Sequence, residues 1–245
     1  MDALTIAAAS GMRARMESLE LLANNIANQA SPGFKADQEF YNLYIAPEAL
    51  ADAQGGGAES VPLIERQWTD FTQGVMSATG NPLHLALNGN GFFTVEGRSG
   101  PLYTRNGSFQ LSPAGQLQTQ EGYAVLDRQG KPIRIDTSAT VDITPDGQIR
   151  QSGAEAASIG TVDFAQPNVL SKETGTYFKL TGAGVHPGSS TATVHQGRLE
   201  MANGSPAESA VRLVTVLRQF EMLQKAILIG AEMNRKAEEV ARVGS

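Results

Sequence analysis

Three histidines are the side chains of this sequence best suited to acid–base or metal chemistry. None of His84, His186 and His195 sits beside a metal-ligand pattern or a nucleophile with its base. His84 falls on the alternate face of an apolar, strand-like run, which favours a solvated side chain. The histidines therefore predict no catalytic site.

Two further patterns that could bind a ligand also fall short. The Gly-Asn-Gly run at 89–91 lacks the full G-x-G-x-x-G spacing of a nucleotide-binding loop and leads into a strand rather than a helix. Asp142, Asp146 and Asp163 do not have the spacing of a calcium loop. The absence of cysteine excludes disulfides and thiolate metal sites. We therefore expect no enzyme activity, no metal and no cofactor.

The net charge and the lengths of the apolar runs bear on two classes of partner, nucleic acids and membranes. The net charge is −6 at pH 7 and the longest basic run is Arg235-Lys236, so we expect no nucleic-acid binding. No stretch approaches the roughly 20 apolar residues of a membrane-spanning helix, so no direct membrane insertion is expected. Residues 1–16 lack the basic start and the apolar length of a cleaved signal peptide, which predicts that any export leaves the N-terminus intact.

Both ends of the sequence have the period of helices that pair along one stripe. In residues 1–35 apolar side chains recur at alternating spacings of 4 and 3, and the helix is expected to end before the Ser-Pro-Gly at 31–33. In residues 205–245 the same alternation follows a capping box of Ser205 and Glu208, with Pro206 at the first helical position. These spacings predict that the two helices pair as a coiled coil. The predicted seam comprises Met12, Met16, Leu19, Ala23, Ile26 and Ala30 in the first helix and Leu213, Val216, Phe220, Leu223 and Ile227 in the second.

Between the two ends the pattern changes to short strands and glycine-rich turns. Residues 36–80 are predicted to form a mostly extended connector with a mobile tip at the three glycines at 55–57. Asn-Gly pairs within 88–91 and at 106–107 predict hairpins. Two similar stretches, LSPAGQL at 111–117 and ITPDGQI at 143–149, favour the same kind of hairpin over a duplicated domain. The predicted fold class is α+β: an irregular antiparallel β domain over 81–204, with terminal helices that pair as a coiled coil.

Three asparagines near the end of the first helix leave two interpretations open. Asn24, Asn25 and Asn28 are poor helix formers, so they could simply mark a fraying helix end. Alternatively, their amides could bind neighbouring chains in a packed assembly, as a buried Asn fixes register in a coiled coil. The second interpretation places them in an assembly interface together with the two apolar stripes.

Four blocks of the sequence resemble the flagellar basal-body rod and hook protein family. ANNIANQASPGFK at 23–35 matches its N-terminal signature, an Asn-Asn pair and a third Asn followed by Gly33, Phe34 and Lys35. LHLALNGNGFFTVEG at 83–97 and YTRNGSFQLSPAGQL at 103–117 resemble its central motifs. QGRLEMANGSPAE at 196–208 resembles the segment before its C-terminal helix, although the usual Ser-Asn-Val-Asn reads Ala-Asn-Gly-Ser here.

The resemblance implies a structural subunit of the bacterial flagellar rod, which crosses the periplasm and is delivered by the flagellar type III export apparatus. It implies that the partners are copies of the chain and other rod and hook proteins, and it favours the proximal over the distal rod. The alternative is a secreted binding module, such as an adhesin with helical oligomerisation ends. That module would need an exposed aromatic cluster, whereas Phe92, Phe93, Tyr103 and Phe109 are expected in the core.

Overall fold

The computed structural model describes residues 3–45, 60–182 and 184–243, and the chain divides into two compact units. Unit 1 comprises Met1–Ala27, Asp37–Trp68 and Ser205–Ser245. Unit 2 comprises Asn28–Ala36 and Thr69–Gly204. The chain therefore passes between the units four times, and each unit is assembled from segments far apart in the sequence.

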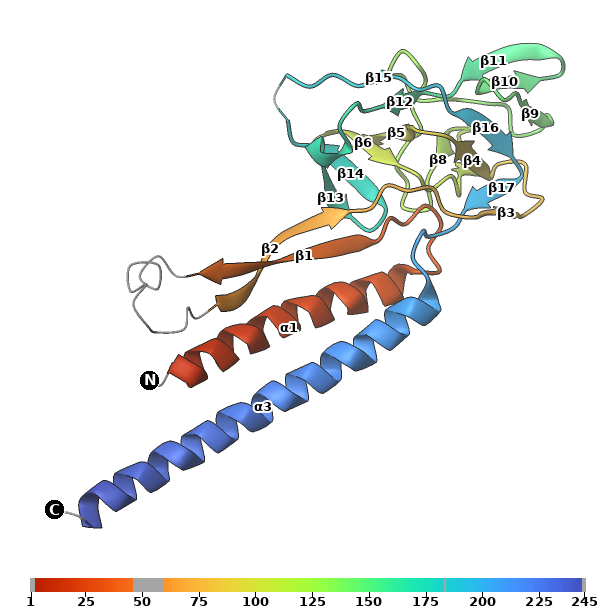
Figure 1. Ribbon diagram of the computed structural model, residues 1–245. Coiled ribbons are helices and arrows are strands. Elements are labelled where there is room, and N and C mark those ends of the chain that lie inside the picture. Colours follow the sequence, from red (N-terminus) through yellow and green to blue (C-terminus); the bar gives the residue numbers. More distant parts are fainter. Residues whose placement is uncertain (1–2, 46–59, 183, 244–245) are drawn as a thin grey trace. The chain divides into compact units, whose positions relative to one another are not determined.

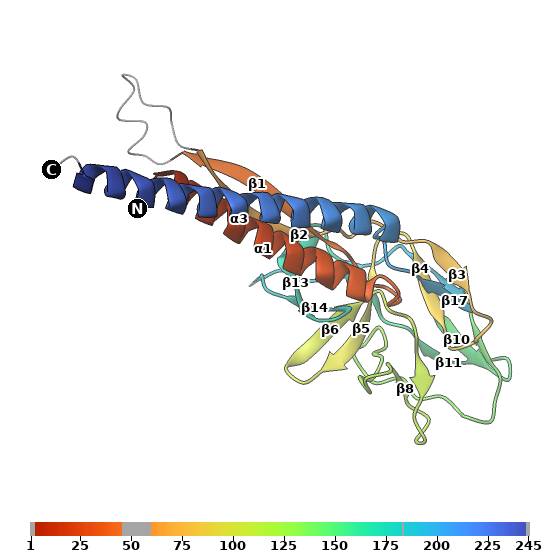
Figure 2. The ribbon, with the colours of Figure 1, turned by 90° about the horizontal axis from the view of Figure 1, so that it is seen from below.

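Unit 1 contains the two long helices of Figures 1 and 2 and a two-stranded sheet. The helices are α1 (Ala3–Asn28) and α3 (Pro206–Val243), and the sheet pairs β1 (Asp37–Ile45) with β2 (Ser60–Thr69). The start of α3 follows the predicted capping signal, since the Ser205 hydroxyl accepts a hydrogen bond from the Glu208 N–H at 3.4 Å. The predicted mobile tip at 55–57 lies outside the described residues.

The prediction that the terminal helices pair as a coiled coil is wrong. The stripe predicted for α1 is not its buried face, because Met16 is 49% exposed, Ala23 is exposed as well, and Ala30 lies beyond the helix end. A methyl group on Gly11 would lie 3.5 Å from the Leu223 side chain, so α3 approaches a face of small residues instead. Since α1 is rich in alanine, apolar residues recur on more than one face and their spacing could not select the buried one. From residue 8 to the end of α1, where side-chain burial is described, the buried positions are Ala8, Gly11, Ala14, Ser18, Leu21 and Leu22.

Unit 2 is built from short antiparallel strands. The largest sheet has six strands in the order β13-β14-β6-β5-β12-β15, beside a three-stranded sheet β11-β10-β9 and the pairs β16-β4, β17-β3 and β7-β8. The strands are β3 (Met76–Ala78), β4 (Leu85–Asn88), β5 (Phe92–Gly97), β6 (Gly100–Thr104), β7 (Gln110–Leu111), β8 (Leu117–Gln118), β9 (Val141–Ile143), β10 (Gln148–Gln151), β11 (Ala154–Ser158), β12 (Thr161–Asp163), β13 (Leu170–Thr174), β14 (Tyr177–Leu180), β15 (Gly188–Ser189), β16 (Thr193–Gln196) and β17 (Arg198–Glu200), with a short 3-10 helix η1 (Pro167–Val169).

The two similar stretches form the same kind of hairpin, as predicted. In the turn between β7 and β8, Ser112 N–H donates to the Gln116 carbonyl and its hydroxyl accepts from the Gln116 N–H. In the turn between β9 and β10, Thr144 makes the same two hydrogen bonds with Gln148. Each turn contains a glycine with positive φ, which a side chain would strain.

The hairpins predicted at the two Asn-Gly pairs are wrong. Strand β4 pairs with β16 and β5 pairs with β6 and β12, so the turn at 88–91 joins two different sheets. Strand β6 likewise pairs with β14 and β7 with β8, on either side of 106–107. At Gly107 a Cβ would come within 1.8 Å of the Leu85 carbonyl oxygen. Glycine is needed here for close approach of two backbones, not for a hairpin turn.

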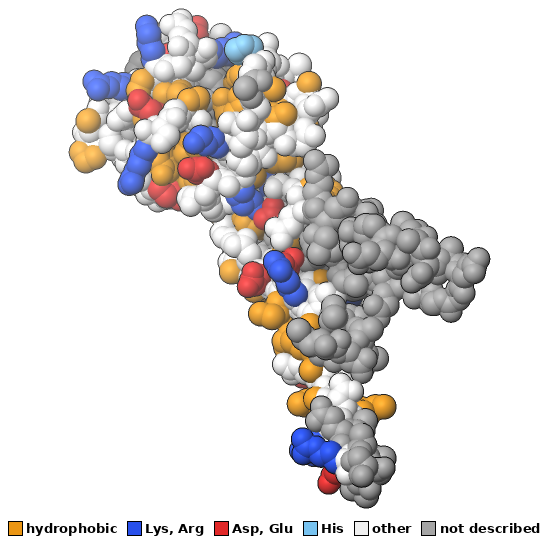
Figure 3. Space-filling view, turned by 90° about the vertical axis from the view of Figure 1, so that its left-hand side faces the viewer, with side chains coloured by type: hydrophobic (Ala, Val, Ile, Leu, Met, Phe, Trp, Pro, Cys, Tyr) orange, Lys and Arg blue, Asp and Glu red, His pale blue; other side chains and the backbone are white. Residues whose placement is uncertain are grey.

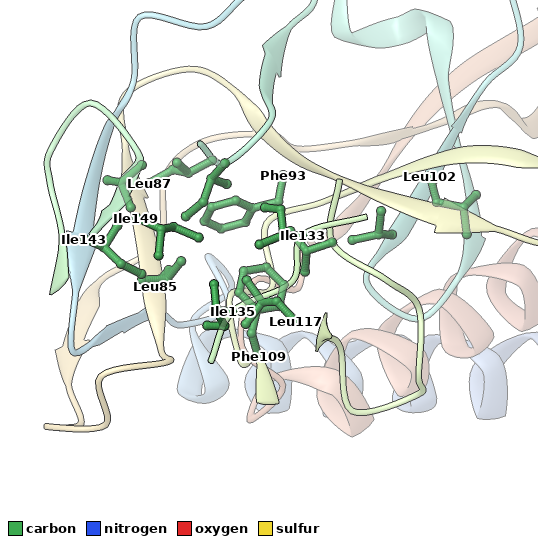
Figure 4. Packing of buried hydrophobic residues seen from close by; sticks show 14 of the residues in the cluster. Leu85, Leu87, Phe93, Leu102, Phe109, Leu117, Ile133, Ile135, Ile143 and Ile149 are labelled. Carbon is green, nitrogen blue, oxygen red and sulfur yellow. The ribbon is translucent and has the colours of Figure 1, made fainter. Parts of the chain in front are cut away.

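Two hydrophobic clusters make up the core of unit 2. The larger one, shown in Figure 4, gathers aliphatic side chains around Phe93 and Phe109. The smaller one is aromatic and includes Phe92 and Tyr103. All four of these aromatic side chains are buried, as the sequence predicted. The adhesin alternative therefore finds no exposed cluster in these rings.

Candidate assembly elements and the buried Glu200 cluster

A single buried carboxylate draws together three distant parts of unit 2. The Glu200 side chain, at the end of β17, is fully buried, and its Oε1 lies 2.6 Å from Lys35 Nζ. Its Oε2 lies 3.2 Å from Arg105 Nη1, and Oε1 also accepts a hydrogen bond from the Gly74 N–H at 2.9 Å. We call Lys35, Arg105 and Glu200 the Glu200 cluster. Its carboxylate has three donors and no open face for a substrate.

The two cations of the cluster are also held by backbone carbonyls. Lys35 Nζ donates to the Thr72 carbonyl at 2.6 Å. Arg105 Nη2 donates to the Gly89 carbonyl at 2.7 Å, and its guanidinium lies 5.4 Å from the centroid of the Phe92 ring. These contacts replace most of the hydration that the two charges lose on burial, which is the condition for keeping charged groups inside a protein.

The cluster contains two positive charges and one negative charge. Burial lowers the pKa of Lys35 below its ordinary value, because desolvation outweighs the attraction of Glu200, and the nearby Arg105 charge acts in the same direction. Burial also lowers the pKa of Arg105, again against the attraction of Glu200. Glu200 is thus shared by two cations that would otherwise repel each other inside the protein.

Two glycines allow the backbones around the cluster to approach closely. Gly33 has φ +68°, and a Cβ there would come within 2.2 Å of the Asn106 backbone nitrogen. A Cβ on Gly74 would come within 2.0 Å of the Met201 carbonyl oxygen. Real Cβ atoms are not found at such distances, so both positions require glycine. The Gly-Phe-Lys of the N-terminal signature therefore places Lys35 against Glu200 through a glycine that any side chain would strain.

Asn203 closes the same region from the C-terminal side. Its Oδ1 accepts a hydrogen bond from the Ala36 N–H at 2.9 Å, and its Nδ2 donates to the Asp70 carbonyl at 2.8 Å. The Asp70 N–H in turn donates to the Ala36 carbonyl at 2.9 Å. Of the two asparagines in the Ser-Asn-Val-Asn that the sequence resembles, only Asn203 is present here. It connects Ala36 with Asp70, so three of the four points at which the chain changes unit lie within two residues of these contacts.

Sequence reasoning missed the Glu200 cluster. Lys35, Arg105 and Glu200 each lie inside a block that resembles the rod and hook family, but nothing local pairs them. No local signal marked these charges as buried, since Arg105 stands between Thr104 and Asn106 and all three lie near glycine-containing turns, where solvated side chains are usual. The partners themselves could not be read, since Lys35 and Glu200 are 165 positions apart.

The predicted assembly residues of α1 are only partly inward-facing. Met12 and Leu19 are half-buried, as is Ile26, whereas Met16 and Ala23 face solvent. The stripe predicted for α3 is its more buried side, with Val216 buried and the other four positions half-buried; these are Leu213, Phe220, Leu223 and Ile227.

The asparagines differ from one another in their surroundings. Asn25 binds its own chain, because its Nδ2 donates to the Asp37 carbonyl at 2.8 Å and its Oδ1 accepts from the Asp37 N–H at 3.0 Å. This amide therefore fastens the end of α1 to the start of β1 and has no need of a neighbouring chain. Asn24 is exposed, and Asn28 is half-buried with its carbonyl accepting from the Ser31 N–H.

A second apolar face of α3 lies at the surface. Exposed Val211, Met222, Ile229 and Met233 fall within about 40° of one another around the helix, opposite the buried stripe. Val214, Leu217 and Leu228 lie farther round the helix on one side, interspersed with Glu221 and Lys225, and the seven apolar side chains are between 43% and 70% exposed. We call these seven residues the outer face of α3. Hydrophobic side chains are visible at the narrow end of the surface in Figure 3.

The remaining candidates for chemistry form no site among the described residues. His84 is half-buried, with Nδ1 3.0 Å from the Thr79 hydroxyl, and no group of acidic and histidine side chains in the described ranges could hold a metal ion. A groove of about 850 Å³ in unit 2 is lined by Thr94, Glu96 and Tyr103 among others, with neither histidine nor cysteine in its wall. Within the described part of the chain, neither helix combines the length and hydropathy needed to cross a membrane.

Two protein-family models match regions of the chain that contribute residues to the Glu200 cluster. Residues 86–151 match the flagellar hook protein FlgE/F/G D1 domain, and residues 195–240 match the flagellar basal body rod FlgEFG protein C-terminal domain. Arg105 lies in the first range, and Glu200 and Asn203 lie in the second.

Full-length relatives point the same way. The chain is 33% identical to the flagellar basal-body rod protein FlgF of Caulobacter vibrioides, over 97% of each chain. It is 31% identical to FlgG of Bacillus subtilis, over 95% of this chain and 97% of that one. It is also 33% identical to FlgG of Agrobacterium fabrum, with the same two coverages. The chain therefore belongs to the family of flagellar basal-body rod proteins and is most like FlgF.

Proposed function

We propose that this chain enters the flagellar rod by burying the outer face of α3 against apolar helix faces of neighbouring axial subunits. Family membership makes the chain a structural, FlgF-like subunit of the basal-body rod that assembles with other rod and hook proteins. The surface that makes the contact is our proposal. It includes exposed Met16 and Ala23 of α1 as a secondary contact.

The observation that carries this proposal is the two-sided character of α3. A helix that covers one core needs a single apolar stripe, and its opposite side is usually charged or polar. Here the side opposite the buried stripe holds several large apolar residues among charged ones, and large exposed apolar side chains on one side of a helix favour an interaction site. Burying one such Ile or Met side chain contributes roughly 1.5–3 kcal/mol, so a row of them is enough to hold subunits together.

Several finer points rest on the sequence resemblance. We propose that the subunit lies in the proximal rod within the periplasm, that it also contacts further copies of itself, and that the flagellar type III apparatus exports it. We also propose a purely structural role without catalysis. The buried carboxylate of Glu200, saturated by two cations and an amide, is consistent with such a role.

The experiment places a charge on the outer face of α3 in motile cells that depend on this chain. Met222→Glu and Ile229→Glu together should abolish swimming and remove the subunit from purified basal bodies, because both carboxylates would have to be buried unpaired. Gln224→Glu adds one charge at an exposed position that is already polar, and should leave both readouts unchanged. Circular dichroism of the purified chains should be the same for all variants.

Normal swimming by the double variant would contradict the proposed surface while leaving family membership intact. Loss of helix content in the purified double variant would show that the outer face covers the chain's own core. In that case α3 would not be the docking element. The two results are separable because one is measured in cells and the other on the free subunit.

A further inference from the structure

Two residues of the Glu200 cluster lie close in sequence to the long helices. Lys35 lies seven residues after the last residue of α1, and Glu200 lies six residues before the first residue of α3. Between them, unit 2 brings residues 33–36 and residues 199–203 together although they belong to opposite ends of the chain. The question is whether these two segments attach to unit 2 separately or as one.

We propose that the Glu200 cluster is a lock in which residues 33–36 and 199–203 close onto unit 2 in one cooperative step. The lock operates within a single chain, before any assembly, so it goes beyond the proposed function and does not depend on it. Its consequence is that the segment after α1 and the segment before α3 become ordered on unit 2 together or not at all.

The hydrogen bonds at the cluster support a joint closure. The Gly33 N–H donates to the Glu200 carbonyl at 2.7 Å, while the Glu200 carboxylate binds Lys35 from the same N-terminal segment. The Ala36 N–H is bound by the Asn203 side chain. Each segment therefore supplies the partners of the other, and if one segment leaves, polar groups of the other are left buried without partners.

The middle of the chain takes part in the same closure. Gly74 N–H and Arg105 both bind the Glu200 carboxylate, and Lys35 binds the Thr72 carbonyl. Lys172 adds a fourth attachment, since its Nζ donates to the Lys35 carbonyl at 2.9 Å and lies 4.4 Å from the centroid of the Phe34 ring. Opening the lock at any one of these points would therefore weaken the remaining ones.

The charge count of the cluster makes the proposal specific. Glu200→Gln deprives two buried cations, Lys35 and Arg105, of the carboxylate that binds them both. Lys35→Met leaves the neutral pair of Arg105 and Glu200. The first change should therefore open the lock more than the second. The double variant should open no more readily than Glu200→Gln alone, since both substitutions break the same pair and the double variant also removes one of the stranded cations.

The test is native-state hydrogen exchange on the full-length chain. The reporters are the amides of Gly33, Ala36 and Met201, which donate to Glu200, Asn203 and Val75 respectively. In Glu200→Gln all three should exchange faster by a common factor on the order of 100, and in Lys35→Met by a smaller common factor on the order of 10.

The core supplies the internal reference for this measurement. The amides of Val125 and Ile133 bond to carbonyls within unit 2 and should keep their exchange rates in Lys35→Met. Lys131→Met and Glu155→Gln are matched controls, because they make the same chemical changes at exposed positions of unit 2 and should alter none of the amides.

Two results would overturn the lock. One is acceleration of the Gly33 amide with no change at Met201, because the two segments would then attach independently. The other is additive effects in the double variant, because the charges would then act separately. If Glu200→Gln fails to fold, Lys35→Met still decides the first point. In that event Lys35→Met also decides the second point, because a common acceleration at Gly33, Ala36 and Met201 would support the shared charge cluster and no acceleration at any of them would exclude it.

Discussion

Unit 2 buries three charged side chains at one place, whereas α3 leaves a row of large apolar side chains at the surface. Both arrangements reverse the usual distribution of residue types. The difference between them lies in where the partners are. Every charge of the Glu200 cluster finds a partner in its own chain, while the outer face of α3 finds none among the described residues.

The comparison separates what is complete within one chain from what is not. A buried charge is tolerated only when its partners are fixed in place, so the cluster indicates that unit 2 closes on itself. An exposed apolar face is tolerated in the free chain but gains free energy when a partner covers it. The predictions below test this division, beginning with the largest expected effect.

Glu200→Gln should produce the largest loss of stability. It deprives buried Lys35 and Arg105 of the carboxylate that binds them both, which costs about 3–5 kcal/mol in the free energy of unfolding. Urea denaturation followed by circular dichroism gives this quantity. Glu155→Gln, at an exposed position, should change it by less than about 0.5 kcal/mol. Equal effects of the two substitutions would show that the cluster is not energetically distinct from the surface.

The same substitution at two glycines should have opposite signs. Gly33→Ala should lower the free energy of unfolding by about 3 kcal/mol, because φ is +68° and the new Cβ would meet the Asn106 backbone at 2.2 Å. Gly11→Ala in α1 should raise it by up to about 1 kcal/mol, because Ala is the better helix former and the contact with Leu223 at 3.5 Å is an ordinary one. A lower free energy of unfolding in both variants would contradict the expected difference in sign between Gly33 and Gly11.

Asn25→Leu tests the attachment of α1 to β1. It removes both hydrogen bonds with the Asp37 backbone, which should cost about 1–3 kcal/mol although Leu favours the helix. Hydrogen exchange at the Asp37 amide should rise accordingly in the free monomer. An unchanged exchange rate at the Asp37 amide would contradict this attachment and would favour the interpretation in which Asn25 contacts another chain.

The smallest expected effect is the contribution of Lys35 to the dependence of stability on pH. Its pKa in the folded chain lies below the ordinary value of 10.5, chiefly because burial desolvates the ammonium group; Glu200 raises it, Arg105 lowers it and Asp70 raises it. As pH rises toward 10.5, the folded chain releases this proton before the unfolded chain does, so stability increases with pH. The stability of the native chain relative to Lys35→Met should therefore rise across this window. A flat or falling difference would mean that Glu200 outweighs desolvation.

Local features of the fold could be predicted from the sequence. The start of α3 follows from Ser205 and Pro206, and the end of α1 falls before the Ser-Pro-Gly at 31–33. The two similar turns at 113–115 and 145–147 were predicted correctly as hairpins of one kind. Each of these features depends on residues within a few positions of one another, where caps, Pro and positive-φ glycine act directly on the backbone.

The sequence by itself thus determined the helices, the two similar turns at 113–115 and 145–147, the buried aromatic residues and the family. Only the tertiary structure decided which side of α1 is buried, which strands pair across the Asn-Gly turns, and that Lys35 and Arg105 share Glu200. These outcomes depend on groups brought together from distant parts of the chain, and on a glycine at 33 or 107 that lets two backbones touch. A periodic pattern shows that a face is apolar, but the neighbour that covers it is chosen by packing, which no local spacing encodes.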